Sequence, residues 1–326
     1  MLLILQLLEQ RELFVRLGAV QLLIAVNRHR SRELQDAFLF NPTGMMQLMD
    51  MLRDSEEILR NEVMILLMDV ASSNAEIQKI ASFNGAFERL YEIMKDEGNT
   101  GFIVRDCLQL MVNLLRGNMF TQRYFRETSS IERLLAVFPD QDTAALKTSP
   151  AIAALVVEVV EELGCGVPSD GQNAVHVKAN KEILGKTLLL AVAQVATVPL
   201  GAKVSSEGRC AALQALCVLV DAHEANASRL WRVILPEGDH GPPRPATSQL
   251  LIDLLQHNGT AAEKKALRRV FDTFLRGSSQ IQLDMAKTYS PEVQERTGLD
   301  EVSIIHEGAA GLAPPFDTAR LSVCRA

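Results

Sequence analysis

The side chains that could bind a metal or act as a nucleophile are scattered along this sequence rather than clustered. The six histidines form no His-x-x-x-His pair, and they are His29, His176, His223, His240, His257 and His306. The five cysteines form no Cys-x-x-Cys pair, and they are Cys107, Cys165, Cys210, Cys217 and Cys324. Zinc sites take their ligands at short, fixed spacings. We therefore expect no metal site, and we interpret the cysteines as reduced thiols.

A nucleotide site and a covalent catalytic site are not indicated either. Gly164-Cys165-Gly166 is the segment most like a glycine-rich phosphate loop, but it lacks the later Gly-Lys-Ser/Thr and a preceding strand. An ordinary loop between helices is the favoured interpretation. No Gly-x-Ser-x-Gly elbow occurs, and no cysteine adjoins a plausible base in the sequence. We expect a chain that is not an enzyme and that takes no cofactor.

The composition is that of a folded protein built from aliphatic side chains. Hydrophobic residues make up 48% of the 326 residues, charged residues 22% and aromatic residues only 5%. A core filled by aliphatic side chains suits close-packed helices better than a β-sandwich, whose strands favour aromatic and β-branched residues. The net charge is −7 without a long basic run. This disfavours nucleic-acid binding, because a phosphate backbone requires clustered Lys and Arg.

The apolar N-terminus, Met1–Gln10, could be mistaken for a signal peptide. It lacks a positively charged start, and Gln6 and Glu9 interrupt the apolar run. The pattern instead predicts an amphipathic helix, as if a helical array began midway. No run of ~18 uncharged apolar residues follows, so we expect no membrane-spanning helix.

A pattern that occurs twice between Asn41 and Leu135 organises the sequence. An apolar helical segment at 58–63 is followed by 74–80 and 86–90, and a similar segment at 103–108 is followed by 120–125 and 130–134. Three sets of equivalent residues recur, namely Arg16, Arg60 and Arg105; Gln35, Gln78 and Gln122; and Met45, Phe87 and Ile131. A helical period of this size is typical of stacked repeats. It predicts an all-α fold, an armadillo-like α-solenoid formed as a right-handed superhelix of three-helix repeats.

Apolar periodicity and turn residues place the individual elements. The predicted helices cover 2–10, 14–27, 32–40, 45–53, a segment beginning at 54–57, 150–163, 179–195, 209–222, 230–235, 246–256 and 261–276. The predicted loops cover 41–44, 139–143, 164–171 and 236–245. We expect residues 1–290 to form one armadillo-like domain and residues 291–326 a loosely structured tail. No heptad pattern occurs, so no coiled coil is expected in this chain.

Armadillo proteins that read extended peptides carry a ladder of asparagines on the third helix of each repeat. The position eight residues after Arg16, Arg60 and Arg105 is occupied by Ile24, Met68 and Asn113. Only one of the three is asparagine, which argues against a general peptide groove. We expect Asn113 to make a local hydrogen bond between helices.

Several contiguous segments resemble the globular head of the general vesicular transport factor family. They are Asn41–Ser55, Ile58–Glu62, Asn74–Ile80, Phe83–Leu90, Gly117-Asn118, Gln122–Phe125 and Pro242–Ala246. The resemblance covers about residues 1 to 285, densely up to Phe138. It implies an armadillo-like tether head. Compared with this family, we expect the sequence to begin after the first repeats and not to include the long coiled coil and acidic tail. A homodimer is therefore expected only if a coiled coil follows.

The resemblance also implies a function based on binding rather than catalysis. Such a head would promote docking of vesicles in transport from endoplasmic reticulum to Golgi and within the Golgi. Its partners would be a Rab-type GTPase, SNARE proteins and golgins. It would be cytoplasmic, located peripherally on Golgi membranes and vesicles. The alternative is another armadillo or HEAT scaffold, such as a cargo adaptor.

Surface polar residues where the resemblance is densest are the candidates for partner binding. They are Arg53, Asp54, Arg60, Asn61, Gln78, Lys79, Glu88 and Arg89. The competing interpretation is that most of them are solvated or make contacts within a repeat, because a few anchors normally carry an interface. Gln78 recurs with Gln35 and Gln122, which favours a structural role for it.

Overall fold

The computed structural model describes residues 2–98, 101–137, 150–165, 171–198, 205–235, 243–255, 259–276 and 278–288. The chain divides into two compact units, Met1–Thr187 and Leu188–Ala326. Within the described residues, regular structure is helical apart from one pair of two-residue strands. The all-α prediction is therefore confirmed. None of the described helices is both long and apolar enough to cross a membrane.

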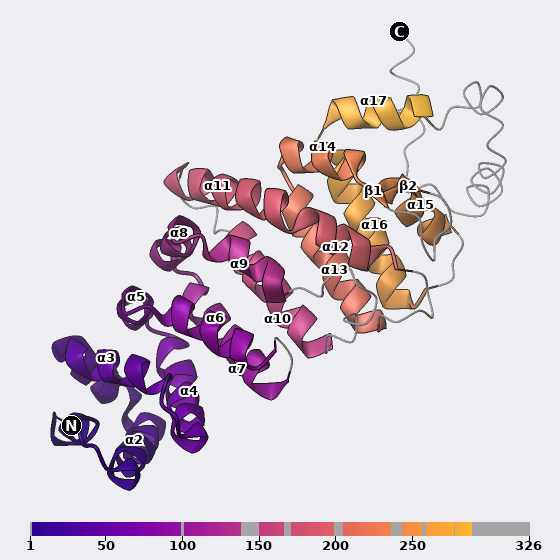
Figure 1. Cartoon of the computed structure of the whole chain (residues 1–326). Helices are drawn as coiled ribbons and strands as arrows, with labels where there is room; N and C mark the ends of the chain where they lie inside the picture. Colours follow the sequence, from indigo (N-terminus) through magenta and orange to yellow (C-terminus); the bar gives the residue numbers. More distant parts are fainter. Residues whose placement is uncertain are drawn as a thin grey trace. The chain divides into compact units, whose positions relative to one another are not determined.

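Unit 1 consists of helices that repeat in groups of three (Figure 1). They are α1 (Leu2–Leu7), α2 (Leu13–Phe40), α3 (Pro42–Met51), α4 (Glu57–Ala71), α5 (Ala75–Phe83), α6 (Ala86–Asp96), α7 (Phe102–Leu115), α8 (Met119–Glu127), α9 (Ser130–Val137), α10 (Pro150–Gly164) and α11 (Gly171–Thr187). The helix α2 kinks at Arg30, where φ is −142° and ψ is 51°. The expected helices 14–27 and 32–40 are thus the two arms of one kinked helix.

The long helices α2, α4, α7 and α10 form the interior row of unit 1, and each contacts the next. In α4 the buried side chains include Leu59, Val63, Leu66 and Val70, which recur every three or four residues and so lie on one face. Each long helix is followed by a short helix and then by a medium one, as in α4, α5 and α6. The predicted three-helix unit is confirmed between α4 and α9.

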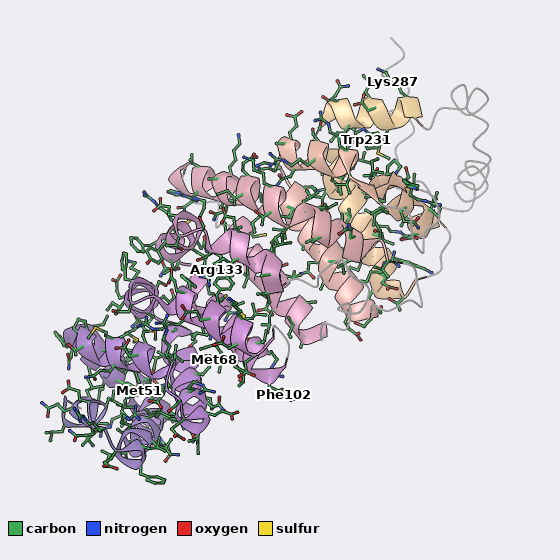
Figure 2. All side chains as sticks on the ribbon, viewed as in Figure 1. Met51, Met68, Phe102, Arg133, Trp231 and Lys287 are labelled. Carbon is green, nitrogen blue, oxygen red and sulfur yellow. The ribbon has the colours of Figure 1, made fainter. Side chains whose placement is uncertain are left out.

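Unit 2 continues the helical pattern and adds a short β-ribbon. Its elements are α12 (Leu189–Ala196), α13 (Ser206–Val220), α14 (Glu224–Arg232), β1 (Ile234–Leu235), β2 (Arg244–Pro245), α15 (Ala246–Leu255), α16 (Ala261–Arg276) and α17 (Ser279–Thr288). The strands β1 and β2 are antiparallel, with Ile234 opposite Pro245. The helix α13 contacts α12, α14 and α16. In both units, side chains fill the space between neighbouring helices (Figure 2).

Four further differences from the predicted elements are larger than a shift of a few residues at a helix end. The helix expected at 179–195 is two helices, because α11 ends at Thr187 and α12 begins at Leu189. The helix expected at 230–235 is wrong beyond Arg232, since Val233 is extended and Ile234 enters β1. The turn expected at 41–44 ends early, because Pro42 starts α3, where its fixed φ suits a first helical turn.

The fourth difference is α17, which the sequence analysis did not predict. Its exposed Leu283 weakens the apolar periodicity of the segment. The predicted loop at 139–143, most of that at 236–245, and the predicted tail at 291–326 lie outside the described residues.

Candidate partner surface

Gln78 joins three helices of unit 1 from inside the repeat stack. Its Nε2 donates to the carbonyl oxygens of Ala71 at 3.0 Å and Asn113 at 2.8 Å. Its Oε1 accepts from Nδ2 of Asn118 at 2.8 Å. In the next repeat, Gln122 donates in the same way to the Leu115 carbonyl at 2.9 Å. Carbonyl groups at the C-terminal ends of α4 and α7, which have no hydrogen-bond donor within their own helix, are thereby satisfied. The structural role predicted for these glutamines is confirmed.

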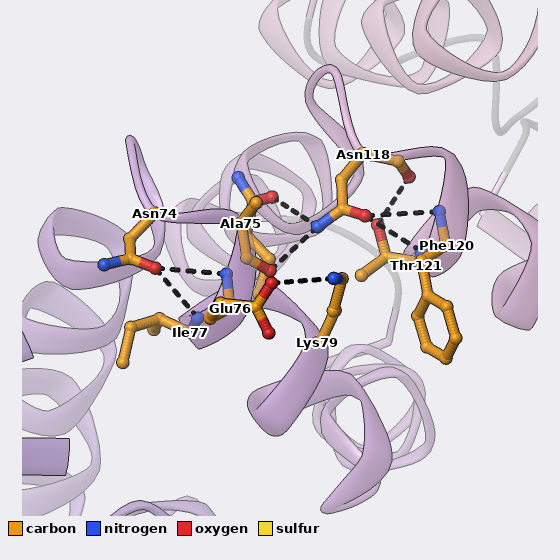
Figure 3. Close-up of polar contacts among 9 residues, drawn as sticks. Asn74, Ala75, Glu76, Ile77, Lys79, Asn118, Phe120 and Thr121 are labelled. Carbon is orange, nitrogen blue, oxygen red and sulfur yellow. Dashed lines mark hydrogen bonds and ion pairs between the residues drawn. The ribbon is translucent and has the colours of Figure 1, made fainter. Parts of the chain in front are cut away.

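Two asparagines repeat a second arrangement at the starts of α5 and α8 (Figure 3). Asn74 Oδ1 accepts from the backbone N–H groups of Glu76 at 3.1 Å and Ile77 at 3.2 Å. Its Nδ2 donates to Gln35 Oε1 at 3.0 Å. Asn118 caps α8 in the same manner and reaches back to Gln78. Each amide therefore caps its own helix and bonds the preceding repeat.

Asn113 makes the helix-to-helix hydrogen bond that was expected for it. Its Nδ2 donates to the Met68 carbonyl at 2.9 Å, which links α7 to α4. Its side chain is buried, and its Oδ1 accepts from Gln109. The side chain is thus used within the fold rather than presented to a peptide.

The charged candidates lie mostly on the outside of unit 1 and pair between repeats. Arg53 forms an ion pair with Glu92, and Arg89 pairs with Asp50 at 2.6 Å. Both pairs connect the α3 region to α6. The Arg53–Glu92 pair is half exposed on both sides, so we assign it little net stability.

Asp54 and Arg60 lie together at the turn between α3 and α4. Asp54 pairs with Arg16 and accepts the backbone N–H of Glu56 at 3.1 Å. Arg60 donates to the carbonyl of Asp54 at 2.8 Å. Burial alone would raise the pKa of Asp54, but the Glu56 N–H and the two guanidinium groups together lower it. The turn is therefore held in one conformation by charge-assisted bonds.

The remaining candidates are distributed over the surface and the interior. Asn61 is exposed on α4. Lys79 pairs with Glu76 on α5 at 2.7 Å (Figure 3). Glu88 lies on α6 and is partly exposed. Gln78 is only 3% exposed, so its side chain has no face to offer a partner.

An exposed aromatic cluster was missed by the sequence analysis. The ring centroid of Phe83 on α5 lies 5.1 Å from those of Phe120 and Tyr124 on α8. Phe83 is 58% exposed and Phe120 is 42% exposed. One signal could have indicated it, since Phe83 follows Gln78 by five residues just as the exposed Phe40 follows Gln35.

The described residues contain no cluster of three or more His, Cys, Asp or Glu that could hold a metal ion. Burial raises the pKa of the Cys107 thiol to about 12 and that of Cys217 to about 11. These thiols remain protonated at neutral pH, and a protonated thiol is a poor nucleophile.

Comparison with curated proteins gives relatives that include a vesicular transport factor and a golgin candidate. General vesicular transport factor p115 from Homo sapiens is 29% identical over 300 residues, which are 91% of this chain and 30% of p115. Golgin candidate 6 from Arabidopsis thaliana is 32% identical over 302 residues, which are 89% of this chain and 32% of the relative. The chain thus spans about a third of the length of these curated relatives. No family model matches it.

Solved structures agree with the predicted fold. The crystal structure of Uso1-2 superposes with a TM-score of 0.79 at 23% identity, covering 91% of this chain and 46% of that chain. A designed armadillo repeat protein superposes with a TM-score of 0.58 at 15% identity, covering 83% of this chain and 98% of that chain. The armadillo-like fold is therefore confirmed. The chain is a homologue of the p115/Uso1 general vesicular transport factors and corresponds to their head region.

Proposed function

We propose that this chain is the non-catalytic head of a vesicle tether that acts between endoplasmic reticulum and Golgi and within the Golgi. Its alignment with vesicular transport factor p115 over 91% of the chain carries this proposal. The names of the other relatives, golgin candidate 6 and the yeast intracellular protein transport protein, agree with it. The chain spans about a third of the length of p115 and golgin candidate 6, so the activity of the whole tether is part of this proposal.

The proposed partners are a Rab-type GTPase, SNARE proteins and golgins. Binding to them would place the chain in the cytoplasm, peripherally on Golgi membranes and transport vesicles. The head would comprise residues 1–290, and it would dimerise only where a coiled coil follows it. A rigid stack of helices suits this task because it holds separate contact residues at fixed spacings.

The proposed contact residues are the exposed and partly exposed members of the predicted set. They are Arg53, Asp54, Arg60, Asn61, Lys79, Glu88 and Arg89. Gln78 is assigned a supporting role because its polar atoms hold Ala71, Asn113 and Asn118. The ion pair of Arg53 can open towards a partner at small cost, since exposed surface pairs contribute little.

Co-sedimentation with Golgi membranes tests the proposal. The purified chain is mixed with the membranes and with a Rab GTPase loaded with either GTP or GDP. We expect enrichment in the pellet that increases with the GTP-loaded form. A designed armadillo protein of similar size serves as the control, because it shares the fold without the surface. Sedimentation no greater than this control would contradict the tether and favour an unrelated armadillo scaffold.

A further inference from the structure

The first long helix of unit 1, α2, exposes apolar side chains at positions that are buried in the other repeats. The equivalent arginines of α2, α4 and α7 mark matching positions in the three helices. In α4 and α7, the residues one position before and six positions after the arginine are fully buried, and they are Leu59, Leu66, Val104 and Met111. In α2 the matching residues are Val15, which is 38% exposed, and Leu22, which is 51% exposed.

The difference follows from the neighbours of each helix. The helix α4 contacts α2 and α7, and α7 contacts α4 and α10, so each of them lies between two long helices. Among the described helices only the six-residue α1 precedes α2, which lies at the end of this row (Figure 1). Val15 and Leu22 therefore belong to the face that a neighbouring helix covers in the other repeats.

The exposed face of α2 is an apolar stripe with an open position. Val15, Gly18, Leu22 and Ala25 follow one another at steps of three or four residues, so they lie on one side of the first arm of α2. Ala25 is exposed, and no side chain of the described residues lies within 4 Å of the place that a Cβ at Gly18 would occupy. A side chain from a second helix can therefore enter above Gly18, between the ridges that the larger residues form.

Basic residues follow the stripe on the next turn of α2. Arg28 and His29 are exposed, and neither forms an ion pair with any other residue that the structure describes. Arg30, at the kink, is paired with Glu33 at 3.2 Å. A helix that covers the stripe and reaches this turn would gain from acidic side chains, because complementary charges favour association.

We propose that Val15, Gly18, Leu22 and Ala25 form a docking site for an amphipathic helix of a partner protein. Apolar side chains of the partner, three, four and seven residues apart, pack along the stripe, one of them above Gly18. Its acidic side chains lie beside Arg28. This packing is continuous with that of unit 1, where α2 packs on α4 and α4 on α7.

The inference goes beyond the proposed function, since none of the proposed contact residues lies on α2. The two also fail separately. Loss of membrane sedimentation with intact peptide binding would remove the tether and keep this site. Sedimentation without peptide binding would keep the tether and remove this site.

Fluorescence anisotropy with a labelled amphipathic peptide tests the site. The peptide is an Ala-based helix with Leu at alternating steps of three and four residues and Glu at the flanking positions. We expect saturable binding that is weaker when Lys replaces each Glu. Leu22→Ser should weaken binding of the Glu peptide roughly fivefold, and Arg28→Gln should weaken it roughly two- to threefold. Absence of binding to the Glu peptide would overturn the site.

Gly18→Leu distinguishes a contact with a defined shape from general apolar attraction. The new side chain enters open space, and Leu favours a helix more than Gly does, so the fold should be retained. It also adds apolar surface, but it occupies the position of the partner's side chain. We therefore expect binding to fall roughly tenfold. Unchanged or increased binding would show non-specific attraction and would overturn the site.

Ile65→Ser is the matched control, because it removes a comparably exposed apolar side chain from α4 instead. It should bind the peptide as the unaltered chain does, and a loss equal to that of Leu22→Ser would overturn the site. Sedimentation velocity of the chain alone identifies another occupant. A concentration-dependent dimer that Gly18→Leu abolishes would assign the face to a second copy and overturn the partner helix. Circular dichroism confirms that each variant keeps its helix content.

Discussion

The most deeply buried polar contacts between helices are made by neutral amides in unit 1 and by an ion pair in unit 2, whereas the ion pairs that join repeats of unit 1 are more exposed. In unit 1, Gln78, Asn113 and Asn118 bond to one another and to carbonyl groups of neighbouring helices. In unit 2, Arg209 on α13 donates to the Ala196 carbonyl at 3.0 Å and pairs with Asp253 on α15. Both arrangements satisfy buried polar groups, but they differ in what happens when one partner is removed.

The C-terminal ends of α4, α7 and α13 are bonded in the same way in the two units. Asn226 donates to the Leu219 carbonyl at 2.9 Å, seven residues back, as Gln78 does to Ala71 and Gln122 to Leu115. The difference therefore concerns contacts between repeats rather than helix ends.

Removing one charge from unit 2 should have the largest effect. Arg209 is only 3% exposed, and Asp253→Leu leaves its buried guanidinium without the carboxylate that pairs with it. We expect unit 2 to lose about 3–5 kcal/mol of unfolding free energy. Trp231 is the only tryptophan and lies in α14, so its fluorescence during urea unfolding reports on unit 2. The double variant Arg209→Leu/Asp253→Leu should recover part of the loss. An unchanged urea midpoint for Asp253→Leu would contradict the ionic link.

Removing the central amide of unit 1 should have a smaller effect. Gln78→Leu keeps the volume but leaves the Ala71 and Asn113 carbonyls and the Asn118 amide without this partner. We expect a loss of about 1–3 kcal/mol, measured by circular dichroism during urea unfolding. Gln21→Leu, on the exposed face of α2, is the control. Were Gln78 a direct partner contact instead, its replacement would leave stability as it was.

Replacing the N-cap residues Asn74 and Asn118 should reduce the unfolding free energy by less than replacing Gln78, and by different amounts. Asn74→Ala should cost about 1 kcal/mol, the usual value for an N-cap. Asn118→Ala should cost more, about 2 kcal/mol, because Asn118 is buried and donates both to Gln78 and to the Ala75 carbonyl, whereas Asn74 donates to Gln35 alone. Urea midpoints of the two variants measured side by side check the order. The opposite order would show that the repeats are not joined through Asn118.

The smallest expected effect is on the stability of the chain at low pH. The pKa of Asp54 is lower in the folded chain than its ordinary value, so its charged form stabilises the fold above about pH 4, the unfolded value. This contribution disappears as the pH falls through the lowered folded value. Asp54→Asn should remove this pH dependence of the unfolding free energy. We expect the change to be a fraction of a kcal/mol, because the Arg16–Asp54 ion pair is partly exposed. Parallel stability curves for both chains between pH 5 and pH 2.5 would show that Asp54 is not responsible.

The repeat period allowed much of unit 1 to be predicted from the sequence. Gln78 and Gln122 were recognised because a structural residue must recur wherever the same helix end must be satisfied. The contacts between repeats follow the same rule, since Gln35–Asn74 and Asp50–Arg89 are each 39 residues apart. Pairing residues at that separation would have identified them.

Features without a period could not be predicted. The pair Arg209–Asp253 occurs once, and no local pattern marks either residue as buried. The strand β1 depends on its pairing with β2, which tertiary contact decides. The aromatic cluster was hidden because Phe83 fits an apolar helical pattern, and only the fold shows that the ring lies outside.

The most direct measurement tests whether the exposed charges of unit 1, in contrast to its buried amides, are needed for membrane binding. The variant Arg53→Glu/Arg60→Glu reverses two charges of the proposed surface, and co-sedimentation with Golgi membranes and GTP-loaded Rab is measured at equal helix content. We predict several-fold less bound protein. The exposed Arg53 pair contributes little to stability, whereas Arg60 also donates to the Asp54 carbonyl, so loss of helix content in the double variant would show that the arginines are structural. Unchanged sedimentation of the double variant would contradict the assignment of this surface to partner binding.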